Sequence, residues 1–139
     1  MDRGLLKTDL VRDEGMRLHP YRDSVGKWTV GVGRNLDDVG ISEAEALAML
    51  DADIDRAVGD LQRNLPWLSG RPEPVQRALA NMAFNLGWPR LSGFRNMLAA
   101  LESGNYGKAA EEALNSLWAR QVGPRAERVA ALIRQGVRP

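Results

Sequence analysis

Residues 13–33 read DEGMRLHPYRDSVGKWTVGVG, and an apolar pattern of period two fills the second half of this segment. Apolar residues alternate there with small ones, namely Trp28, Val30 and Val32 with Thr29, Gly31 and Gly33, and this alternation is typical of a β-strand. Residues 24–27 supply a turn, so residues 21–33 are predicted to form a β-hairpin. The two glycines leave gaps on the face to which Thr29 points, and such gaps let a ligand or another backbone approach closely.

A short helix is predicted before this hairpin. Four aliphatic residues recur there at helical spacing: Leu5, Leu6, Leu10 and Val11. Gly15 is the residue type best able to end a helix in the left-handed conformation, so the helix is expected to end near Glu14. Asp13 and Glu14 in a last turn oppose the helix dipole, at a cost of roughly 0.3–1 kcal/mol each when exposed. Local rules broken in this way concentrate at functional sites.

The rest of the chain is predicted to be helical. A capping box at residues 42–45 opens an amphipathic helix that reaches about Asn64. Prolines and glycines follow, and residues 75–86 are predicted to form an almost wholly apolar helix, closed by Gly87, that is the buried axis of a bundle. Further helices are predicted at about 93–102, 106–119 and 124–135, the last opened by Pro124.

These elements predict an α+β fold that is mostly α. Residues 1–139 are expected to form one domain with two lobes. The small α+β lobe covers about residues 12–60 and ends in the long helix, and the helical lobe covers about 65–139, with the first helix packed on it. A cleft between the lobes is the default place for a substrate.

The composition excludes several kinds of chemistry. The chain has 139 residues with no cysteine and one histidine, His19, so disulfides, thiolate nucleophiles and cysteine-based zinc sites are ruled out and no metal or cofactor is expected. A Ser-His-Asp triad would need His19, and no nucleophile-elbow motif is present. The longest uncharged stretch, residues 78–89, is far shorter than the ~20 residues of a membrane span, and the charged N-terminus does not resemble a signal peptide. If the protein is an enzyme, catalysis by Asp and Glu side chains is the chemistry that remains.

Charge is distributed unevenly along the chain. Residues 1–70 contain 9 basic and 13 acidic residues, whereas residues 71–139 contain 10 basic and 5 acidic residues. A basic surface suits anionic polymers, nucleic acid included, but scattered arginines more often form an ordinary solvated face.

Glu14, Asp23 and Thr29 are the candidate catalytic residues. A hairpin folded back toward the helix end would bring all three to one side. Glycoside hydrolysis needs two carboxylates in a partly enclosed cleft, one protonated to donate to the leaving oxygen and one ionised to orient water or attack the sugar. Eighteen acidic residues give many such pairs by chance, so this spacing alone leaves the function open.

The wider string around these residues resembles the phage-type lysozymes, or endolysins, of glycoside hydrolase family 24. That family's signature is Glu, eight residues, Asp, five residues, Thr, which Glu14, Asp23 and Thr29 match. The resemblance covers about residues 10–134, and it continues through separate motifs in the same order: Asn81–Gly87, Gly93-Phe94, Ser116–Gln121 and Arg125-Ala126.

The resemblance implies a muramidase that cleaves between N-acetylmuramic acid and N-acetylglucosamine in bacterial peptidoglycan. If Asp23 and Thr29 position a water on the face of the sugar opposite Glu14, its attack is expected to proceed with inversion at the anomeric carbon. Glu14 would be the general acid, and Asp23 and Thr29 would hold the attacking water. Arg125 would ion-pair with the glutamate from the other lobe. The positions that line the sugar-binding cleft in relatives are Gly31, Phe84 and Asn85. This sequence departs from some relatives at Arg34, where they have His, and at Asn85, where they have Gln.

The resemblance also implies a binding partner, an oligomeric state and a location. The expected partner is cell-wall peptidoglycan, with no nucleic acid and no membrane insertion, and the expected state is a monomer. Such an enzyme would stay in the host cytoplasm until it is released to the wall.

Two other functions stay open. A lytic transglycosylase cleaves the same bond with one acid and needs no water-holding Asp–Thr pair. A non-catalytic binder of peptidoglycan or nucleic acid would use four basic residues of the C-terminal helices: Arg120, Arg125, Arg128 and Arg134. Among the single residues, Trp118 and Phe84 also suit a hydrophobic core, and His19 suits the surface.

Overall fold

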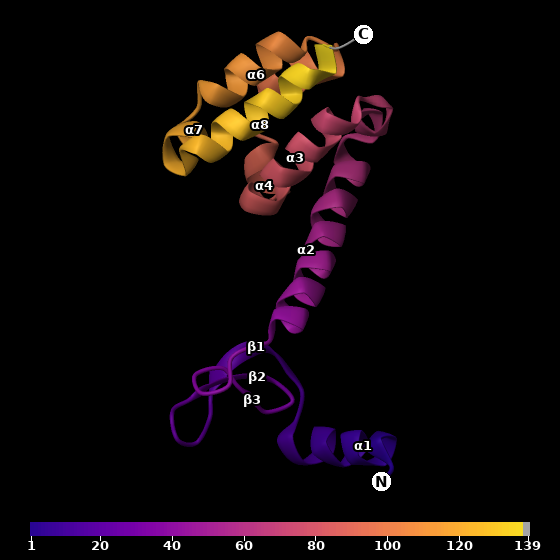
Figure 1. The fold of residues 1–139 in the computed structure, drawn as a ribbon, viewed down its shortest axis with the longest axis vertical. Helices are drawn as coiled ribbons and strands as arrows, with labels where there is room; N and C mark the ends of the chain where they lie inside the picture. The colour runs from indigo at the N-terminus through magenta and orange to yellow at the C-terminus, as the bar shows by residue number, and fades with distance from the viewer. Residues whose placement is uncertain (138–139) are drawn as a thin grey trace. The chain divides into compact units, whose positions relative to one another are not determined.

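The computed structural model describes residues 1–137, which form two compact units (Figure 1). Unit 1 contains residues 1–48, and unit 2 begins at Met49. The long helix α2 (Glu43–Asn64) starts in unit 1 and continues in unit 2.

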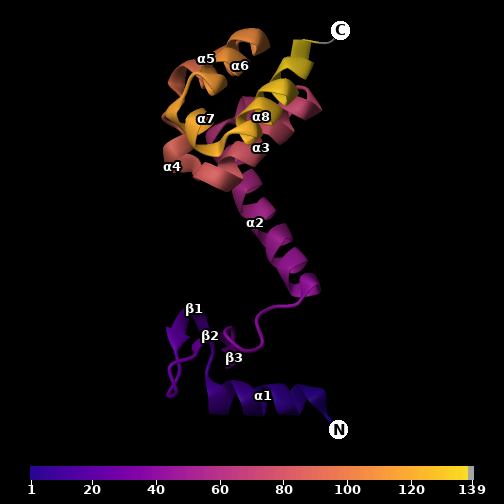
Figure 2. The same cartoon turned by 60° about the vertical axis from the view of Figure 1, so that its left-hand side comes forward.

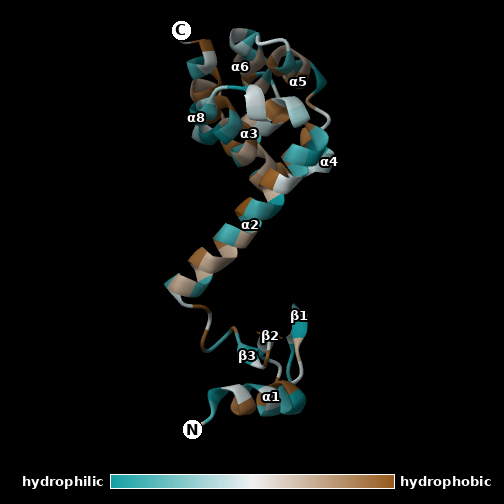
Figure 3. Cartoon of the chain, turned by 90° about the vertical axis from the view of Figure 1, so that its right-hand side faces the viewer, coloured by the Kyte–Doolittle hydropathy of each residue, from teal (hydrophilic) through white to brown (hydrophobic). Residues whose placement is uncertain are grey.

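Unit 1 opens with helix α1 (Arg3–Glu14), which confirms the predicted helix and its end at Glu14. Asp2 caps it by accepting a hydrogen bond from the N–H of Leu5 (2.9 Å), and Gly15 ends it with φ +77°. None of its residues is buried, and brown hydrophobic patches alternate with teal ones along it (Figure 3). Helix α1 therefore adds no buried side chain to unit 1. Its contribution to the candidate site is to place Glu14, its last residue.

Three antiparallel strands follow in the order β1 (Arg17–Arg22), β2 (Trp28–Gly31), β3 (Arg34–Asn35). The predicted hairpin is confirmed, although it begins earlier than Tyr21 and a short third strand extends the sheet. Thr29 on the central strand faces Tyr21 on one side and Asn35 on the other. Thr29 therefore has paired backbone on both sides.

An ion pair joins this sheet to the start of α2. Both guanidinium nitrogens of Arg34 donate to the carboxylate of Glu45, at 2.8 and 2.6 Å. The predicted capping box is confirmed, because Glu45 accepts from the N–H of Ser42 (2.9 Å) while Ser42 Oγ accepts from the N–H of Glu45 (3.1 Å). The hydrogen bonds from Arg34 and then Ser42 lower the pKa of Glu45 to about 2. Arg34, at the position where the resemblance puts His in some relatives, therefore has Glu45 as its structural partner.

Unit 2 is a helical bundle. After α2 it contains a 3-10 turn, η1 (Pro66–Gly70), then α3 (Glu73–Leu86), α4 (Trp88–Leu91), α5 (Arg95–Glu102), α6 (Tyr106–Leu114), α7 (Leu117–Val122), α8 (Pro124–Arg134) and η2 (Gln135–Val137). Figure 2 shows α5 to α8 gathered around α3. The core is built from side chains that are almost fully inaccessible, among them Val75, Leu79, Met82, Leu101 and Ile133. α3 supplies three of these five, which confirms its expected place inside the bundle.

Two of the predicted helix ranges are wrong. The range 106–119 is two helices, because Ser116 is extended (φ −140°) and its Oγ accepts from the N–H of Ala119 (3.1 Å), which starts a new helix. The range 93–102 begins instead at Arg95, and α4 lies before it, opened by Pro89 in its first turn. The prediction of 124–135 agrees with α8 and the first residue of η2.

Of the two single residues that suit a hydrophobic core, one is in the core and the other is not. Trp118 is buried, as predicted. Phe84 is 44% exposed, so its assignment to the core is wrong. Its helix buries the face that carries Leu79 and Met82, and Phe84 lies outside that face. His19 is exposed, as expected. Within residues 1–137, no helix has the length and apolar character that a membrane crossing requires.

Candidate active site

Glu14 lies at the point where α1 ends and the chain turns into the sheet. Its side chain reaches Gly33, in the turn between β2 and β3, so closely that a Cβ at position 33 would stand 2.9 Å from Glu14 Oε2. Gly33 also has φ +67°, in the region that favours glycine. The gap predicted at this position is therefore occupied by the candidate acid itself, whereas a Cβ at Gly31 would meet no atom within 4 Å. The sequence pattern singled out Gly33 but did not reveal what approaches it.

Asp23 caps the hairpin turn with one of its carboxylate oxygens. Oδ1 accepts from the N–H of Val25 (3.0 Å) and from the N–H of Lys27 (2.8 Å), and the N–H of Asp23 donates to the carbonyl of Lys27 (2.9 Å). Within the part of the chain that the structure describes, Oδ2 has no hydrogen-bond partner. One oxygen thus holds the turn, and the other is available for a ligand.

Thr29 is the buried polar residue of the described chain, with 3% of its surface exposed. Its hydroxyl donates to the carbonyl of Lys27 (3.0 Å). The hydroxyl hydrogen is therefore committed to the backbone, while the oxygen keeps capacity to accept. Because the backbone of Lys27 also pairs with Asp23, the two candidates belong to one hydrogen-bonded network.

The three candidate catalytic residues therefore belong to unit 1. Glu14 rests on the turn after β2, Thr29 lies on β2, and Asp23 follows β1. The pairing of β1 with β2 fixes the strands next to Asp23 and under Thr29, and Glu14 contacts the turn that follows β2.

Arg125 begins α8, in unit 2. Its Nε donates to Asn81 Oδ1 (2.9 Å), and its Nη2 approaches the carbonyl of Asn81 (3.4 Å). Both residues line a groove of about 390 Å³ in unit 2, together with Phe84 and with Leu50 and Ile54 of α2. Glu14 and Arg125 belong to different units, so their ion pair and the cleft between the lobes stay predictions.

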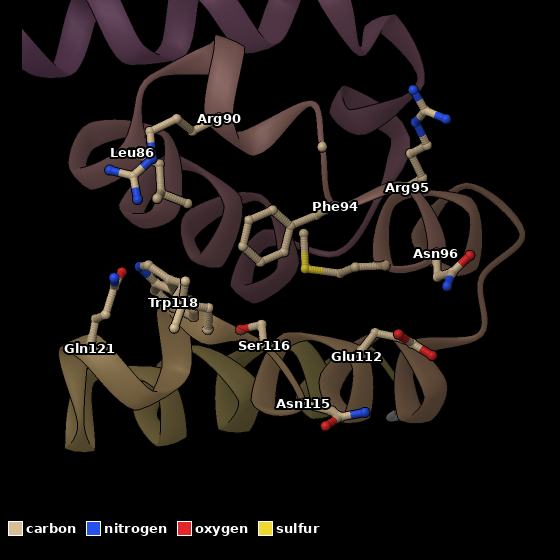
Figure 4. Close-up of a pocket in the computed structure, with 13 residues that line it drawn as sticks. Leu86, Arg90, Phe94, Arg95, Asn96, Glu112, Asn115, Ser116, Trp118 and Gln121 are labelled. Atoms are coloured by element: carbon tan, nitrogen blue, oxygen red, sulfur yellow. The ribbon is translucent and has the colours of Figure 1, made fainter.

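Asn85 is held by Trp118, whose Nε1 donates to Asn85 Oδ1 (2.8 Å). Phe94 meets the indole edge to face, with ring centroids 6.3 Å apart. Phe94, Ser116, Trp118 and Gln121 line one pocket of about 380 Å³, and Figure 4 shows Phe94 on one side of it with Ser116, Trp118 and Gln121 on the other. The structure therefore brings motifs far apart in the sequence into one concavity, which no local pattern predicts.

The comparisons with known proteins agree on one family. The phage lysozyme family model matches residues 11–136. The chain is 28% identical to the probable T4-type lysozyme 2 of Dictyostelium discoideum, with 94% of each chain covered. It is 30% identical to the pre-baseplate central spike protein Gp5 of Enterobacteria phage T4, where the match covers 91% of this chain and 27% of that protein.

A third relative is the SAR-endolysin of Escherichia phage Mu, at 31% identity over 78% of this chain and 63% of that protein. The chain thus spans about a quarter of the spike protein and nearly the whole of the Dictyostelium lysozyme. The family match includes Glu14, Asp23, Thr29 and Arg125. The chain belongs to the phage lysozyme family, the family of glycoside hydrolases that degrade peptidoglycan.

Proposed function

We propose that this protein is a muramidase that hydrolyses the β-1,4 bond between N-acetylmuramic acid and N-acetylglucosamine, causing bacterial lysis. The observation that carries the proposal is the arrangement in unit 1. Glu14 sits on the turn of the sheet, and Asp23 and Thr29 share hydrogen bonds through Lys27. These are the residues that match the family signature of an acid followed by a water-holding pair.

Glu14 is the proposed general acid. It protonates the glycosidic oxygen as the bond breaks and is left as a carboxylate. Arg125 is proposed to reach this carboxylate from the other lobe, where a charge-assisted hydrogen bond would stabilise it after proton transfer. A crystal structure with the Arg125 guanidinium turned away from Glu14 would remove this part of the mechanism.

Asp23 and Thr29 are proposed to hold the attacking water. Since the Thr29 hydroxyl already donates to a carbonyl, it would accept one hydrogen of the water. Asp23 Oδ2 would accept the other. A water held by both hydrogens presents a lone pair to the anomeric carbon, and the Asp23 carboxylate takes the proton that the water loses as the new C–O bond forms and the bond to the leaving oxygen breaks.

Direct attack by this water predicts inversion. The two carboxyl groups should then stand roughly 6.5–9.5 Å apart, against ~5–5.5 Å for a covalent retaining mechanism. The experiment is to digest peptidoglycan and follow the new reducing ends by NMR. An α-anomer formed first from the β-linkage supports the proposal, and a β-anomer formed first contradicts the direct role of Asp23 and Thr29.

The same digest separates hydrolysis from the transglycosylase alternative, because a transglycosylase leaves anhydromuramic ends. A matched variant, Glu14→Gln, tests the acid. It should fold normally and lose at least ~10²-fold of the activity, since a positioned general acid typically contributes 10²–10⁴. A folded variant that clears permeabilised cells at the normal rate would exclude Glu14 from the mechanism.

Sugar binding is proposed for Gly31, Phe84 and Asn85. The exposure of Phe84 and the open space over Gly31 support it, because a ligand needs accessible surface. We also propose that the protein acts as a monomer, with no nucleic-acid partner, no cofactor and no membrane insertion, after release from the host cytoplasm to the wall. DNA binding through the basic helices would instead appear as retention with a steep salt dependence.

A further inference from the structure

The carboxyl group of Glu14 lies directly on the backbone of Gly33. A Cβ built at Gly33 would stand 2.9 Å from Oε2, 3.2 Å from Cδ and 3.4 Å from Cβ of Glu14. The described residues contain eight glycines with positive φ, and at each of the other seven an added Cβ would have no neighbour closer than 3.8 Å. The contact with Glu14 is therefore specific to Gly33.

Little else in unit 1 restrains this side chain. Glu14 is exposed, and within unit 1 no hydrogen bond or ion pair to its carboxyl is formed. A glutamate at the last position of a helix has three rotatable side-chain bonds, so a free carboxyl would sample many positions. The contact with the backbone of Gly33 limits the positions that the Glu14 carboxyl can take.

Gly33 is itself held firmly. Its neighbour Arg34 pairs with Val30 on β2, and the Arg34 guanidinium is fixed by Glu45. The turn that carries Gly33 is thus anchored on both sides. A side chain that rests on this turn takes its position from the sheet, and Thr29 belongs to the same sheet.

We propose that Gly33 is a positioning residue for the reaction, since its missing side chain sets where the carboxyl of Glu14 stands relative to the strand that carries Thr29. This inference rests on the proposed function, in which Glu14 donates the proton. A proton donor must stand within hydrogen-bond reach of the leaving oxygen, so a displacement of the carboxyl lowers the rate of the chemical step.

The direct test is Gly33→Ala, with Gly40→Ala as the matched control. Both glycines have φ +67°, in the region that disfavours alanine, so both variants carry backbone strain, but a Cβ at Gly40 meets only a backbone oxygen, at 3.9 Å. Gly40 has no part in the proposed chemistry, and its carbonyl, which accepts a hydrogen bond from Arg34 Nη1 (3.1 Å), is retained in Gly40→Ala. The difference between the two variants therefore isolates the contact with Glu14.

Because Oε2 is the free end of a flexible side chain, Gly33→Ala is expected to move the carboxyl without unfolding the protein. Its kcat should fall about 10–100-fold below that of Gly40→Ala, as expected for a reacting group displaced by up to 1 Å, while KM stays within about 2-fold. Both variants should remain folded, which their thermal melting curves would show. If Gly33→Ala does not fold, Gly33→Asn replaces it, because asparagine tolerates the left-handed region better and still carries a Cβ.

A readout independent of activity is the ¹³Cδ resonance of Glu14 in the NMR spectrum. Gly33→Ala should shift it, and Gly40→Ala should not. A second readout is a double-mutant cycle that combines Gly33→Ala with Glu14→Asp, a substitution that shortens the side chain by one methylene and so withdraws the carboxyl. The kcat losses of Gly33→Ala and Glu14→Asp should combine to less than their product, because both displace the same group.

Three outcomes would overturn the inference: an unshifted resonance in Gly33→Ala, equal kcat in the two glycine variants, or multiplicative losses in the cycle. The proposed function can fail separately. If Glu14→Gln is fully active while Gly33→Ala still shifts the resonance, the contact exists but the acid is wrong, and the positioning role of Gly33 is withdrawn with it.

Discussion

Replacement of Thr29 by valine separates the chemistry of this residue from its structural role. The side chain is 3% exposed, and its hydroxyl donates to the carbonyl of Lys27. Valine removes that hydrogen bond, at about 0.5–1.5 kcal/mol. The carbonyl keeps its second donor, the N–H of Asp23, so no buried acceptor is left unpaired. The added methyl group contributes about 0.8 kcal/mol in the opposite direction. The net change in unfolding free energy should therefore be below about 1 kcal/mol.

The activity of Thr29→Val should fall by about 10², because the water loses one of its two acceptors and with it a productive orientation. Thr29→Ser is the control. It keeps the hydroxyl but loses a buried methyl group, which costs about 1 kcal/mol. The serine variant should thus be the less stable and the more active of the two. Urea unfolding gives the stabilities, and turbidity clearing of permeabilised cells gives the rates. A valine variant with more than half of the normal rate would refute the water-holding role.

The remaining predictions concern stability and the pocket. Arg34→Met should lower the unfolding free energy at pH 7. The difference should shrink as the pH falls from the usual Glu45 value of 4.5 toward about 2, because Glu45 has its pKa depressed in the folded state, and the hydrogen bond from Arg34 to the carbonyl of Gly40 accounts for what is left. Urea titrations at several pH values measure the difference, and a difference that is the same at pH 7 and pH 2 would contradict the ion pair as its source. Gly136→Ala should lower the melting temperature, since a Cβ there would stand 2.7 Å from the ring of Tyr106; an unchanged value would contradict this close packing. Trp118→Phe should cost about 1 kcal/mol in urea unfolding through the hydrogen bond that its indole donates, and an unchanged stability would show that water replaces that bond.

Local patterns predicted much of unit 1. The end of α1 at Glu14 follows from Gly15, whose left-handed conformation few other residues adopt. The hairpin follows from alternation, and the start of α2 from reciprocal bonds between Ser42 and Glu45. Each of these signals acts over a few residues, so it is visible in the sequence itself.

Tertiary contacts account for what the sequence did not reveal. β3 has two residues, too few for a periodic signal, and it exists because β2 pairs with it. The break before α7 depends on one capping side chain, that of Ser116, inside a run that otherwise favours helix. Phe84 looked like a core residue because its helix is apolar on most sides, and only the packed bundle shows which face remains open. The contact between Glu14 and Gly33 joins residues nineteen positions apart and has no sequence signal beyond the glycine.

The turn cap made by Asp23 has a consequence for the use of this protein as a reagent. Both N–H groups that bind Oδ1 can bind the amide oxygen of asparagine, through weaker hydrogen bonds than to the carboxylate, and asparagine is common in such turns. Asp23→Asn is therefore expected to keep the hairpin while it removes the negative charge and replaces Oδ2 by an NH₂ group. Under the proposed mechanism, the variant would still bind peptidoglycan but would not cleave it, so that a fluorescent dye attached to it would label the wall polymer. One substitution would then turn the proposed hydrolase into a probe.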